Sequence, residues 1–582
     1  MSGLLLVCWR DPSSRTHSAD DLLELARSLA PSNISPHRPI LQESPGLALA
    51  VLNPVAAARA RHGGACVGTL FDSREDWWKV GRDSPDGSYA ICRSDADRVE
   101  LVTDDFGSRP LWYVQTADVF LASTSQRAIV RLLGDFTLNP RAVSWMLSAG
   151  CLGPEDSWDS RLRRVPPGTR LTLDRHAWAL SASRGAPPDD LAAVPMNEAE
   201  QVTLMGQAVA QTCEALDLTV PDWRLPLSGG KDSRCLLIYL QRAGFTPRCI
   251  TWGTARSRLS ENSDAQVAAL VAQAMGAEQQ YFVVDRAKES QSEALGRFVA
   301  AGEGLVDHLS AYADGLDMWR ELFESGVTGV IRGEVAMGWY VVKAPEHGRR
   351  AIVPALADYA AHAVIRQLEL PAQTWPDHLR QLPDETPQEH ADRLYFEIRL
   401  PRVLAPLNLL KCGHVEVAEP LLSRAVSRLA RRILLTRRAI PVVRELTERE
   451  GPNVPFATDT ALASVERCVR EAVVAQEVRR ELSSATAARV FPGNAVELLL
   501  GGMVEHSSDK GLAWKRALRG AARLAPARAQ RLGAQVVPVS VLPFQLAFRA
   551  YIASRTVAMF TSDAAAAATL PRCQSTAGST RE

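Results

Sequence analysis

The sequence has no excess charge of either sign and no recognisable cysteine pattern. Lysine plus arginine and aspartate plus glutamate both number 66 among 582 residues, so the formal net charge is zero. This balance argues against the broad positive field of a protein that acts on RNA or DNA. The ten cysteines form no CxxC pair and no cluster with histidine. Neither a zinc site nor a disulfide framework is indicated, and a reducing compartment fits.

Long apolar segments are also missing. No stretch reaches the roughly eighteen apolar residues that a membrane helix needs. The first apolar run, LLLVCW, is shorter than the core of a signal peptide and follows no basic leader. We therefore expect a soluble, cytoplasmic protein that binds neither membrane nor nucleic acid. The chain is too long for one ordinary core, so two or three domains are expected.

The most informative stretch is DWRLPLSGGKDS, residues 222–233. The apolar run Leu225–Leu227 stops at a serine and two glycines, and leucines at helical spacing begin soon afterwards. This pattern predicts a strand, a tight loop and a helix. The glycines let the backbone approach a ligand, while the free N–H groups and positive dipole end of the helix favour an anion. The pattern is typical of a phosphate-binding loop, and its alternative is a glycine-rich turn without a ligand.

A Walker A loop is excluded at this place. That motif needs a glycine five residues before its second glycine and a serine or threonine after its lysine, whereas Leu225 and Asp232 occupy these positions. An aspartate inside a phosphate loop would repel the phosphates unless a cation lay between them. Asp232 therefore indicates Mg²⁺. The residues resemble instead the SGGxDS pyrophosphate loop of the ATP pyrophosphatases, which split ATP between its α and β phosphates and pass AMP to a substrate.

Residues 1–185 alternate short apolar runs with turns, which predicts a β-rich layered domain. Four pieces resemble, in order, the N-terminal glutaminase domain of asparagine synthetases: PDGSYAIC, TDDFGSRPLWY, VFLASTSQRAI and RRVPPGTRLTL. The chemistry of that domain is missing. Ser2 stands where the family needs a cysteine whose own α-amino group is the base, and Val67-Gly68-Thr69 replaces the family's NGE motif, although Asp86 persists. Cys8 is expected to be a core residue, so we expect no glutamine hydrolysis.

The rest of the chain alternates predicted strands with helices, which favours a parallel sheet whose strand ends open on one site. We expect a linker at 186–196, a second domain at 197–560 with a helical C-terminal part, and a flexible tail at 561–582. The predicted strands after the loop are 248–253, 281–284 and 327–334, and the predicted helices include 197–216, 264–275 and 514–532. The fold class predicted is α/β, with an Ntn-type glutaminase-like sandwich followed by a PP-loop, HUP-like synthetase domain.

This second part resembles the synthetase domain of asparagine synthetases, and the resemblance covers roughly residues 50–425. Gly333-Glu334 begins a segment similar to the family's GEGSDE motif, whose glutamate assists amide formation, and residues 408–423 resemble the segment that lines the acceptor side. The resemblance implies ATP and Mg²⁺ as ligands, Asp232 as the metal-binding residue and Glu334 as the catalytic residue. The residues that it assigns to ATP are Leu227, Ser228, Gly229, Gly230, Lys231, Asp232, Ser233, Thr251, Trp252, Gly253 and Gly333.

Two departures from the family pattern matter. Met337 stands where the family has a second metal-binding aspartate, and the family's late, phosphate-contacting lysine has no counterpart in GPNVPFATDTALAS, residues 451–464. Asp307 and Lys343 are candidates to replace these groups. Glu303 and Asp307 are the next candidates for the base if Glu334 is not the one.

A synthetase half joined to a glutaminase-like half without its nucleophile predicts an amine source other than glutamine. Within the family this pattern is similar to the β-lactam synthetases and the lasso-peptide cyclases, and the retained Glu334 and the basic C-terminal region favour the lasso-peptide type. We therefore expect macrolactam formation on a precursor peptide, with a processing peptidase as partner. The alternatives are an asparagine synthetase, a β-lactam-type ligase acting on a small-molecule carboxylate, and a degenerate scaffold without activity.

Overall fold

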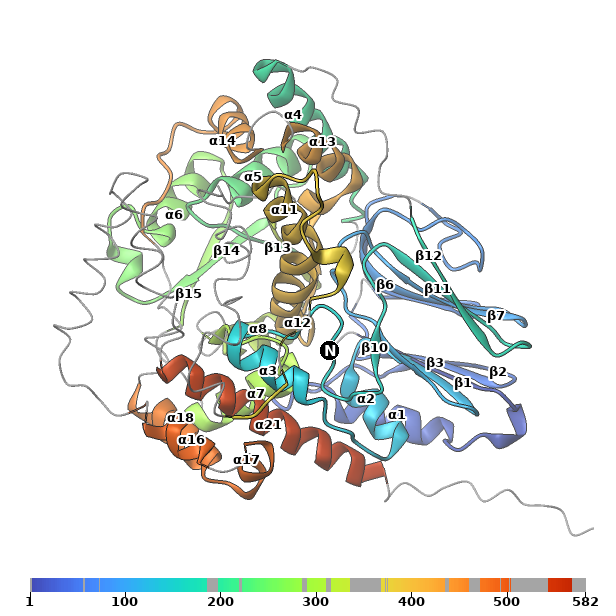
Figure 1. Ribbon diagram of the computed structural model, residues 1–582. Helices are drawn as coiled ribbons and strands as arrows, with labels where there is room; N and C mark the ends of the chain where they lie inside the picture. Colours follow the sequence, from blue (N-terminus) through green and yellow to red (C-terminus); the bar gives the residue numbers. More distant parts are fainter. Residues whose placement is uncertain are drawn as a thin grey trace, which may run out of the picture.

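The computed structural model describes residues 3–55, 58–72, 74–185, 197–218, 222–284, 290–309, 316–334, 368–371, 373, 375–434, 439–459, 471–491, 494–501, 503 and 543–567. Within these ranges the chain is an α/β protein with two antiparallel sheets and one parallel sheet (Figure 1). The antiparallel sheets come from the N-terminal part of the chain and the parallel sheet from the later part. The predicted α/β class with these two kinds of sheet is therefore confirmed.

The two antiparallel sheets pack face to face as a sandwich. The first has the order β10 (Arg163–Arg164), β8 (Trp112–Gln115), β9 (Val119–Ser123), β1 (Gly3–Trp9), β3 (Leu47–Leu52), β2 (Ile40–Ser44). The second has the order β12 (Ala179–Arg184), β11 (Thr169–Asp174), β7 (Arg98–Thr103), β6 (Gly87–Ser94), β5 (Gly64–Leu70), β4 (Arg59–Arg61).

Alternation along the strands explains why both faces of the first sheet are buried. Leu4, Leu6 and Cys8 of β1 point into the space between the two sheets. The intervening Leu5 and Val7 point to the opposite face, where helices α1 (Ala19–Ser28) and α2 (Gln126–Leu133) cover the sheet. Successive side chains of a strand alternate between its faces, so an unbroken apolar run is what a strand with two covered faces requires.

The parallel sheet has the order β15 (Gln279–Val283), β14 (Arg248–Gly253), β13 (Trp223–Pro226), β16 (Gly329–Ile331), β17 (Glu416–Ala418). Helices of the same region cover both faces (Figure 1). They are α4 (Glu198–Ala215), α5 (Lys231–Arg242), α6 (Asp264–Ala274), α13 (Arg424–Leu434) and α14 (Ala439–Glu450) on one side, and α7 (Gln291–Gly302), α8 (Leu316–Glu324) and α12 (Ala405–Cys412) on the other. The parallel sheet predicted from the alternating pattern is confirmed.

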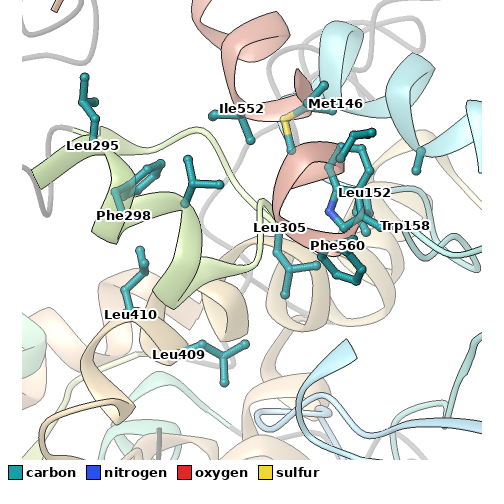
Figure 2. Close-up of a cluster of buried hydrophobic side chains, with 14 of the residues drawn as sticks. Met146, Leu152, Trp158, Leu295, Phe298, Leu305, Leu409, Leu410, Ile552 and Phe560 are labelled. Carbon is teal, nitrogen blue, oxygen red and sulfur yellow. The ribbon is translucent and has the colours of Figure 1, made fainter. Parts of the chain in front are cut away.

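A long C-terminal helix, α21 (Pro543–Ala567), packs against α2 of the N-terminal part and α7 beside the parallel sheet. Figure 2 shows Ile552 and Phe560 of α21 packed among Met146, Leu152, Trp158, Phe298, Leu305 and neighbouring apolar side chains. The remaining helices are α3 (Pro140–Ala149), α11 (Pro387–Leu394), the π-helix η7 (Tyr395–Leu404), α16 (Ala472–Leu482), α17 (Ala485–Val490) and α18 (Ala495–Gly501).

Two sequence-based expectations need correction here. The strands predicted from the sequence after the loop do not include Glu416–Ala418, but these residues form β17, which adds a fifth strand to the parallel sheet. The tail expected from residue 561 is helical as far as Ala567, because Asp563 accepts two hydrogen bonds from Arg127 and anchors the end of α21. The predicted linker 186–196, helix 514–532 and tail residues 568–582 lie outside the described residues. No helix in the described ranges is long and apolar enough to cross a bilayer.

Candidate functional site

The loop 228–230 lies between strand β13 and helix α5, as the sequence predicts. Leu227 still belongs to the sheet, because its N–H donates to the carbonyl oxygen of Ile250 at 2.9 Å. Gly230 is the N-cap of α5 and brings no side chain to satisfy the helix's first N–H groups. The helix therefore presents free backbone donors and the positive end of its dipole at the carboxyl edge of the sheet.

Hydrogen bonds inside the loop fix its shape. Ser228 N–H donates to Ser233 Oγ at 3.1 Å, and Gly230 N–H donates to Ser228 Oγ at 3.2 Å. Gly229 N–H donates to Oδ1 of Asp264, the first residue of α6, at 3.1 Å. One N–H group of the loop thus already binds an anionic oxygen, which is the interaction that a phosphate would make.

Strand β16 delivers Glu334 directly beside this loop. A Cβ atom on Gly333 would lie 3.0 Å from the Asp232 backbone carbon and 3.1 Å from the Ser233 nitrogen. Only glycine permits this approach without displacing the start of α5. The close packing of Gly333 explains why a glycine precedes the glutamate, and it places Asp232 and Glu334 in one site.

Each carboxylate of the site pairs with a neighbouring basic side chain. Lys231 Nζ lies 3.0 Å from Asp232 Oδ2, and Arg332 donates to Glu334 Oε1 at 2.6 Å. The other carboxylate oxygen of Asp232, Oδ1, is buried and accepts no hydrogen bond from any described residue. Burial, with a further contribution from Glu334, raises the pKa of the Asp232 carboxyl, although Lys231 acts to lower it. An orphaned, desolvated carboxylate oxygen is what a bound cation would satisfy.

Three hydrogen-bonded polar side chains are buried close to Glu334, within the segment that the resemblance assigns to the acceptor side. Asn408 donates to Glu419 Oε1 at 2.6 Å, Lys411 Nζ donates to Asn408 Oδ1 at 3.0 Å, and all three side chains are almost fully buried. Burial and the neighbouring Glu334 raise the pKa of Glu419 to about 7. Burial, with Arg332 nearby, holds the pKa of Lys411 well below its usual value. Sequence reasoning missed these residues, since a lysine inside the apolar run NLLKC gives no sign of its partners.

Thr251, Trp252 and Gly253, which the resemblance assigns to ATP, differ in their surroundings. Thr251 lies next to the loop and is buried, and its hydroxyl donates to the Leu227 carbonyl oxygen at 2.7 Å. Gly253 ends β14 at the edge of the same region, where its carbonyl oxygen accepts from Val284 N–H. Trp252 points to the face of the sheet opposite α5, where it packs edge-on against Trp319 with ring centroids 5.6 Å apart. Thr251 and Gly253 are thus close to the loop, whereas Trp252 is part of the core packing.

The segment 454–459 covers the loop but supplies no lysine. Ala457 N–H donates to the Gly229 carbonyl oxygen at 3.1 Å. Arg234 of α5 donates to the carbonyl oxygens of Val454 and Pro455 and lies over the ring of Phe456 at 4.4 Å. This segment is the part of the chain in which the resemblance would place the late lysine. Met337 and Lys343 lie outside the described residues.

Glu303 and Asp307, the alternative candidates for the catalytic base, both make structural contacts. Glu303 accepts hydrogen bonds from the Ser125 hydroxyl and from Gln126 N–H, and so caps the start of α2. Asp307 forms a buried ion pair with Arg549 of α21 at 2.6 Å. Although burial alone would raise it, Arg549 holds the pKa of Asp307 well below its usual range. The expectation that either residue is a spare base or metal ligand is therefore corrected, because both carboxylates are committed to packing contacts.

The positions in the N-terminal sandwich that the resemblance would assign to glutamine binding contact the region of the parallel sheet instead. The backbone N–H of Arg424 donates one bifurcated hydrogen bond to the two carboxylate oxygens of Asp86, at 3.1 and 3.0 Å, so that Asp86 caps α13. Gly68 N–H donates to Glu416 Oε2 at 3.2 Å, and Arg109 pairs with the other oxygen of Glu416 in a fully buried contact. Cys8 is completely buried between the sheets, as predicted, and burial raises the pKa of its thiol. Ser2 lies outside the described residues.

The residues present fit Mg²⁺ held together with phosphates. No group of three or more His, Cys, Asp or Glu side chains gathers into a metal site within the described ranges. Mg²⁺ is commonly bound through one or two carboxylates while substrate phosphates and water supply its other ligands. The single orphaned oxygen of Asp232, beside a loop of backbone donors, matches this arrangement.

Comparisons with known proteins give little help. No known family model matches the sequence, and no curated protein matches it. One solved structure, described as glutamine phosphoribosylpyrophosphate (PRPP) amidotransferase from B. subtilis complexed with ADP and GMP, is 9% identical, covers 49% of this chain and 83% of that chain, and gives a TM-score of 0.20. Another, described as the allosteric regulatory enzyme of purine biosynthesis, is 10% identical over 48% of this chain and 80% of that chain, with a TM-score of 0.20. Similarity at this level says nothing about activity.

Proposed function

We propose that the protein is an ATP-dependent, AMP-forming carbon–nitrogen ligase whose site lies at the carboxyl ends of β13, β14 and β16. The observation that carries this proposal is the close packing of Gly333 on the backbone of Asp232, which unites the loop 228–230 with Glu334. Ligands of parallel sheets bind where the carboxyl ends of the strands open. A phosphate-type loop and a carboxylate base at that edge support nucleotide-driven amide formation.

The first step is activation of a carboxylate. A carboxylate oxygen of the substrate attacks the α-phosphorus of ATP, the bond to the bridging oxygen breaks, and pyrophosphate leaves with the electron pair. The free backbone N–H groups at the start of α5 and the ammonium group of Lys231 bind phosphate oxygens. Asp232 would hold Mg²⁺, which would neutralise phosphate charge.

The second step joins the amine. The amine nitrogen attacks the acyl carbon, AMP leaves, and Glu334 accepts the proton that the nitrogen loses. Arg332 fixes the orientation of the Glu334 carboxylate through the 2.6 Å hydrogen bond. Holding amine and acyl group in one site makes the step effectively unimolecular, which is most favourable when both groups belong to the same molecule.

The surroundings of the N-terminal domain support a substrate that carries its own amine. Asp86 and Gly68 make contacts between domains, so neither is free to hold glutamine. We propose an intramolecular reaction in which a side-chain carboxylate of a precursor peptide is joined to the peptide's α-amine, giving a lasso-type macrolactam. A peptidase that exposes this amine is the expected partner.

A degenerate scaffold is the second candidate, and two observations favour it. Gly229 N–H is already engaged by the Asp264 carboxylate, and the segment 454–459 brings backbone and Phe456 to the loop instead of a lysine. A scaffold would bind ATP without releasing AMP, whereas the ligase releases AMP when its substrate is present.

The test incubates the full chain with ATP and Mg²⁺ in three mixtures, containing the precursor peptide with its peptidase, aspartate with ammonia, or no acceptor. The ligase proposal predicts AMP and a peptide lighter by one water in the first mixture. AMP formation only with aspartate and ammonia would identify an asparagine synthetase. ATP binding without AMP in every mixture would establish the scaffold.

A further inference from the structure

A cleft lies between the N-terminal sandwich and helix α13, and the residues of the loop 228–230 do not line it. Its volume is about 460 Å³, within the range of ligand-binding pockets. Helix α13 borders it on one side, and the hairpin of β11 and β12 and the turn around Asp105 border it on the other. The cleft thus brings together segments far apart in the chain.

The lining of this cleft is positively charged. Five arginines and three carboxylates face it, which leaves an excess of two positive charges. Two of the carboxylates are neutralised, because Asp105 pairs with Arg424 at 3.0 Å and Glu397 pairs with Arg184 at 2.9 Å. Arg428 and Arg431 follow Arg424 on α13 at helical spacing, so the three guanidinium groups form one stripe along the cleft.

Arg428 and Arg431 have no carboxylate partner among the described residues. Arg428 is exposed, whereas Arg431 is half-buried and lies over the ring of Phe396 at 4.5 Å. Burial, with Arg184 adding to it, lowers the pKa of the Arg431 guanidinium, although Glu397 and Asp105 act in the opposite direction. A cation that is partly desolvated and lacks a counter-ion gains most from an incoming anion.

The lining favours carboxylates over nucleotides. Arginine forks match a carboxylate through two parallel hydrogen bonds. Phe106 is the aromatic residue of the lining, and it is only 2% exposed, so it offers no ring face on which a base could stack. The π-helix η7 links the cleft to the candidate site. Its residue Glu397 lines the cleft, and burial together with the negative charge of Glu334 raises the pKa of Tyr395 in the same helix.

We infer that this cleft binds an acidic segment of a peptide, with its carboxylates on Arg428 and Arg431. The inference rests on the proposed function, because the segment would belong to the peptide substrate. Such a contact holds the peptide by a segment that does not react. Helix η7 then lies between this segment and the reacting groups. Binding should weaken with added salt, since the pairs involving exposed groups are screened.

The test measures binding of a fluorescent eight-residue peptide of alternating glutamate and serine to the full chain by fluorescence anisotropy at low salt. A peptide with glutamine in place of glutamate is the uncharged control. Arg428→Glu should weaken binding of the acidic peptide about tenfold or more, because one charge-assisted contact becomes a repulsion. Arg428→Lys should retain most of the affinity. Arg27→Glu is the matched control, since Arg27 is also exposed on a helix without an ion pair among the described residues, and it should change nothing.

Each contrary outcome overturns the inference. Equal binding of the two peptides would show that charge does not select the ligand. An unchanged affinity in Arg428→Glu would place the acidic peptide elsewhere, and displacement by inorganic triphosphate more readily than by unlabelled acidic peptide would identify a phosphate site. Failure of the proposed function is a separate result: the acidic peptide would still bind at α13 while no AMP formed with any substrate.

Discussion

The N-terminal sandwich and the region of the parallel sheet use their buried polar groups in opposite ways. In the N-terminal sandwich, Asp86 and Gly68 lie where the resemblance would place a glutamine site, but both are hydrogen-bonded to the other domain. At the carboxyl edge of the parallel sheet, Asp232 keeps a buried oxygen without a partner in the described structure. Satisfied polar groups between the two regions hold them together, whereas a buried polar oxygen without a partner indicates a ligand.

The same contrast holds for the buried charges. Glu416 and Arg109 neutralise each other in the interface, and each has additional hydrogen bonds. Glu419 and Lys411 are as deeply buried, but a neutral asparagine stands between them. The first arrangement is suited to holding two domains together, and the second leaves groups whose protonation responds to their surroundings. The experiments below test this division.

The largest effect is expected from Asp232→Asn. The variant keeps the size of the side chain but removes the charge that would hold Mg²⁺ and offset the phosphates. Formation of AMP and pyrophosphate should fall to background, while the unfolding midpoint stays close to that of the wild type. Asp118→Asn, at an exposed turn, is the control and should have full activity. Turnover near the wild-type rate in Asp232→Asn would refute the pyrophosphate-loop assignment.

Glu334→Gln separates the two chemical steps. Loss of a general base costs about a hundredfold to ten-thousandfold in rate. Peptide-dependent exchange of labelled pyrophosphate into ATP should survive in this variant, because Glu334 acts after the acyl-AMP has formed, while macrolactam product falls steeply. If exchange and product fall together, Glu334 instead helps to hold ATP or metal. If neither falls, Glu334 is not the base.

The interface pair should matter for stability and not for chemistry. Glu416→Ala leaves the Arg109 guanidinium buried beside Cys412 without its carboxylate, which should cost about 3–5 kcal/mol of unfolding free energy. The double variant Glu416→Leu with Arg109→Met should recover much of this loss. Glu43→Ala breaks the exposed pair with Arg15 and should cost no more than about 1 kcal/mol. Urea unfolding measures all three, and equal losses in Glu416→Ala and Glu43→Ala would contradict the role given to the buried pair.

Glu419 should make stability depend on pH. Its pKa rises from 4.5 to about 7 on folding, so the folded state holds the proton more tightly than the unfolded state. The stabilisation is complete below pH 4.5 and is lost as the pH rises through 7, at up to about 1.4 kcal/mol per unit of pKa difference. Glu419→Gln should therefore flatten the decline of unfolding free energy between pH 5 and about 7. The exposed Glu24→Gln should leave that decline as it is in the wild type, and an unchanged slope in Glu419→Gln would show that Glu419 does not titrate there.

The smallest effect is expected in the glutaminase-like domain. Glutamine should neither bind nor release glutamate, and Ser2→Ala should leave the rate of AMP formation unchanged, because a serine there lacks a thiolate's nucleophilicity. A coupled glutamate assay and calorimetric titration with glutamine test this. Glutamate release that disappears in Ser2→Ala would remove the contrast between the two domains.

Local chemistry explains which features could be predicted. The strand, loop and helix around Ser228–Ser233 follow from an apolar run, two glycines and leucines at helical spacing, and the structure has them in this order. The sandwich strands likewise follow from alternation and turns. Both are properties of short stretches, where the residue pattern and the backbone geometry agree.

Features that depend on distant partners could not be predicted. The hydrogen bond from Arg424 to Asp86 joins residues 338 positions apart, and the pair between Arg109 and Glu416 spans 307 positions. Strand β17 is only three residues long and forms because β16 pairs with it. The packing of Trp252 could not be predicted either, since the sheet face on which it lies is set by a distant helix, here α8 with Trp319.

The central claim is that the edge of the parallel sheet activates a carboxylate with ATP. The most direct measurement uses a precursor peptide whose carboxylate is labelled with oxygen-18, and follows the label by mass spectrometry after incubation of the full chain with the peptide, its peptidase, ATP and Mg²⁺. Formation of an acyl-AMP predicts one labelled oxygen in the released AMP and a peptide lighter by one labelled water. Unlabelled AMP, or ADP and phosphate in place of AMP and pyrophosphate, would contradict the account.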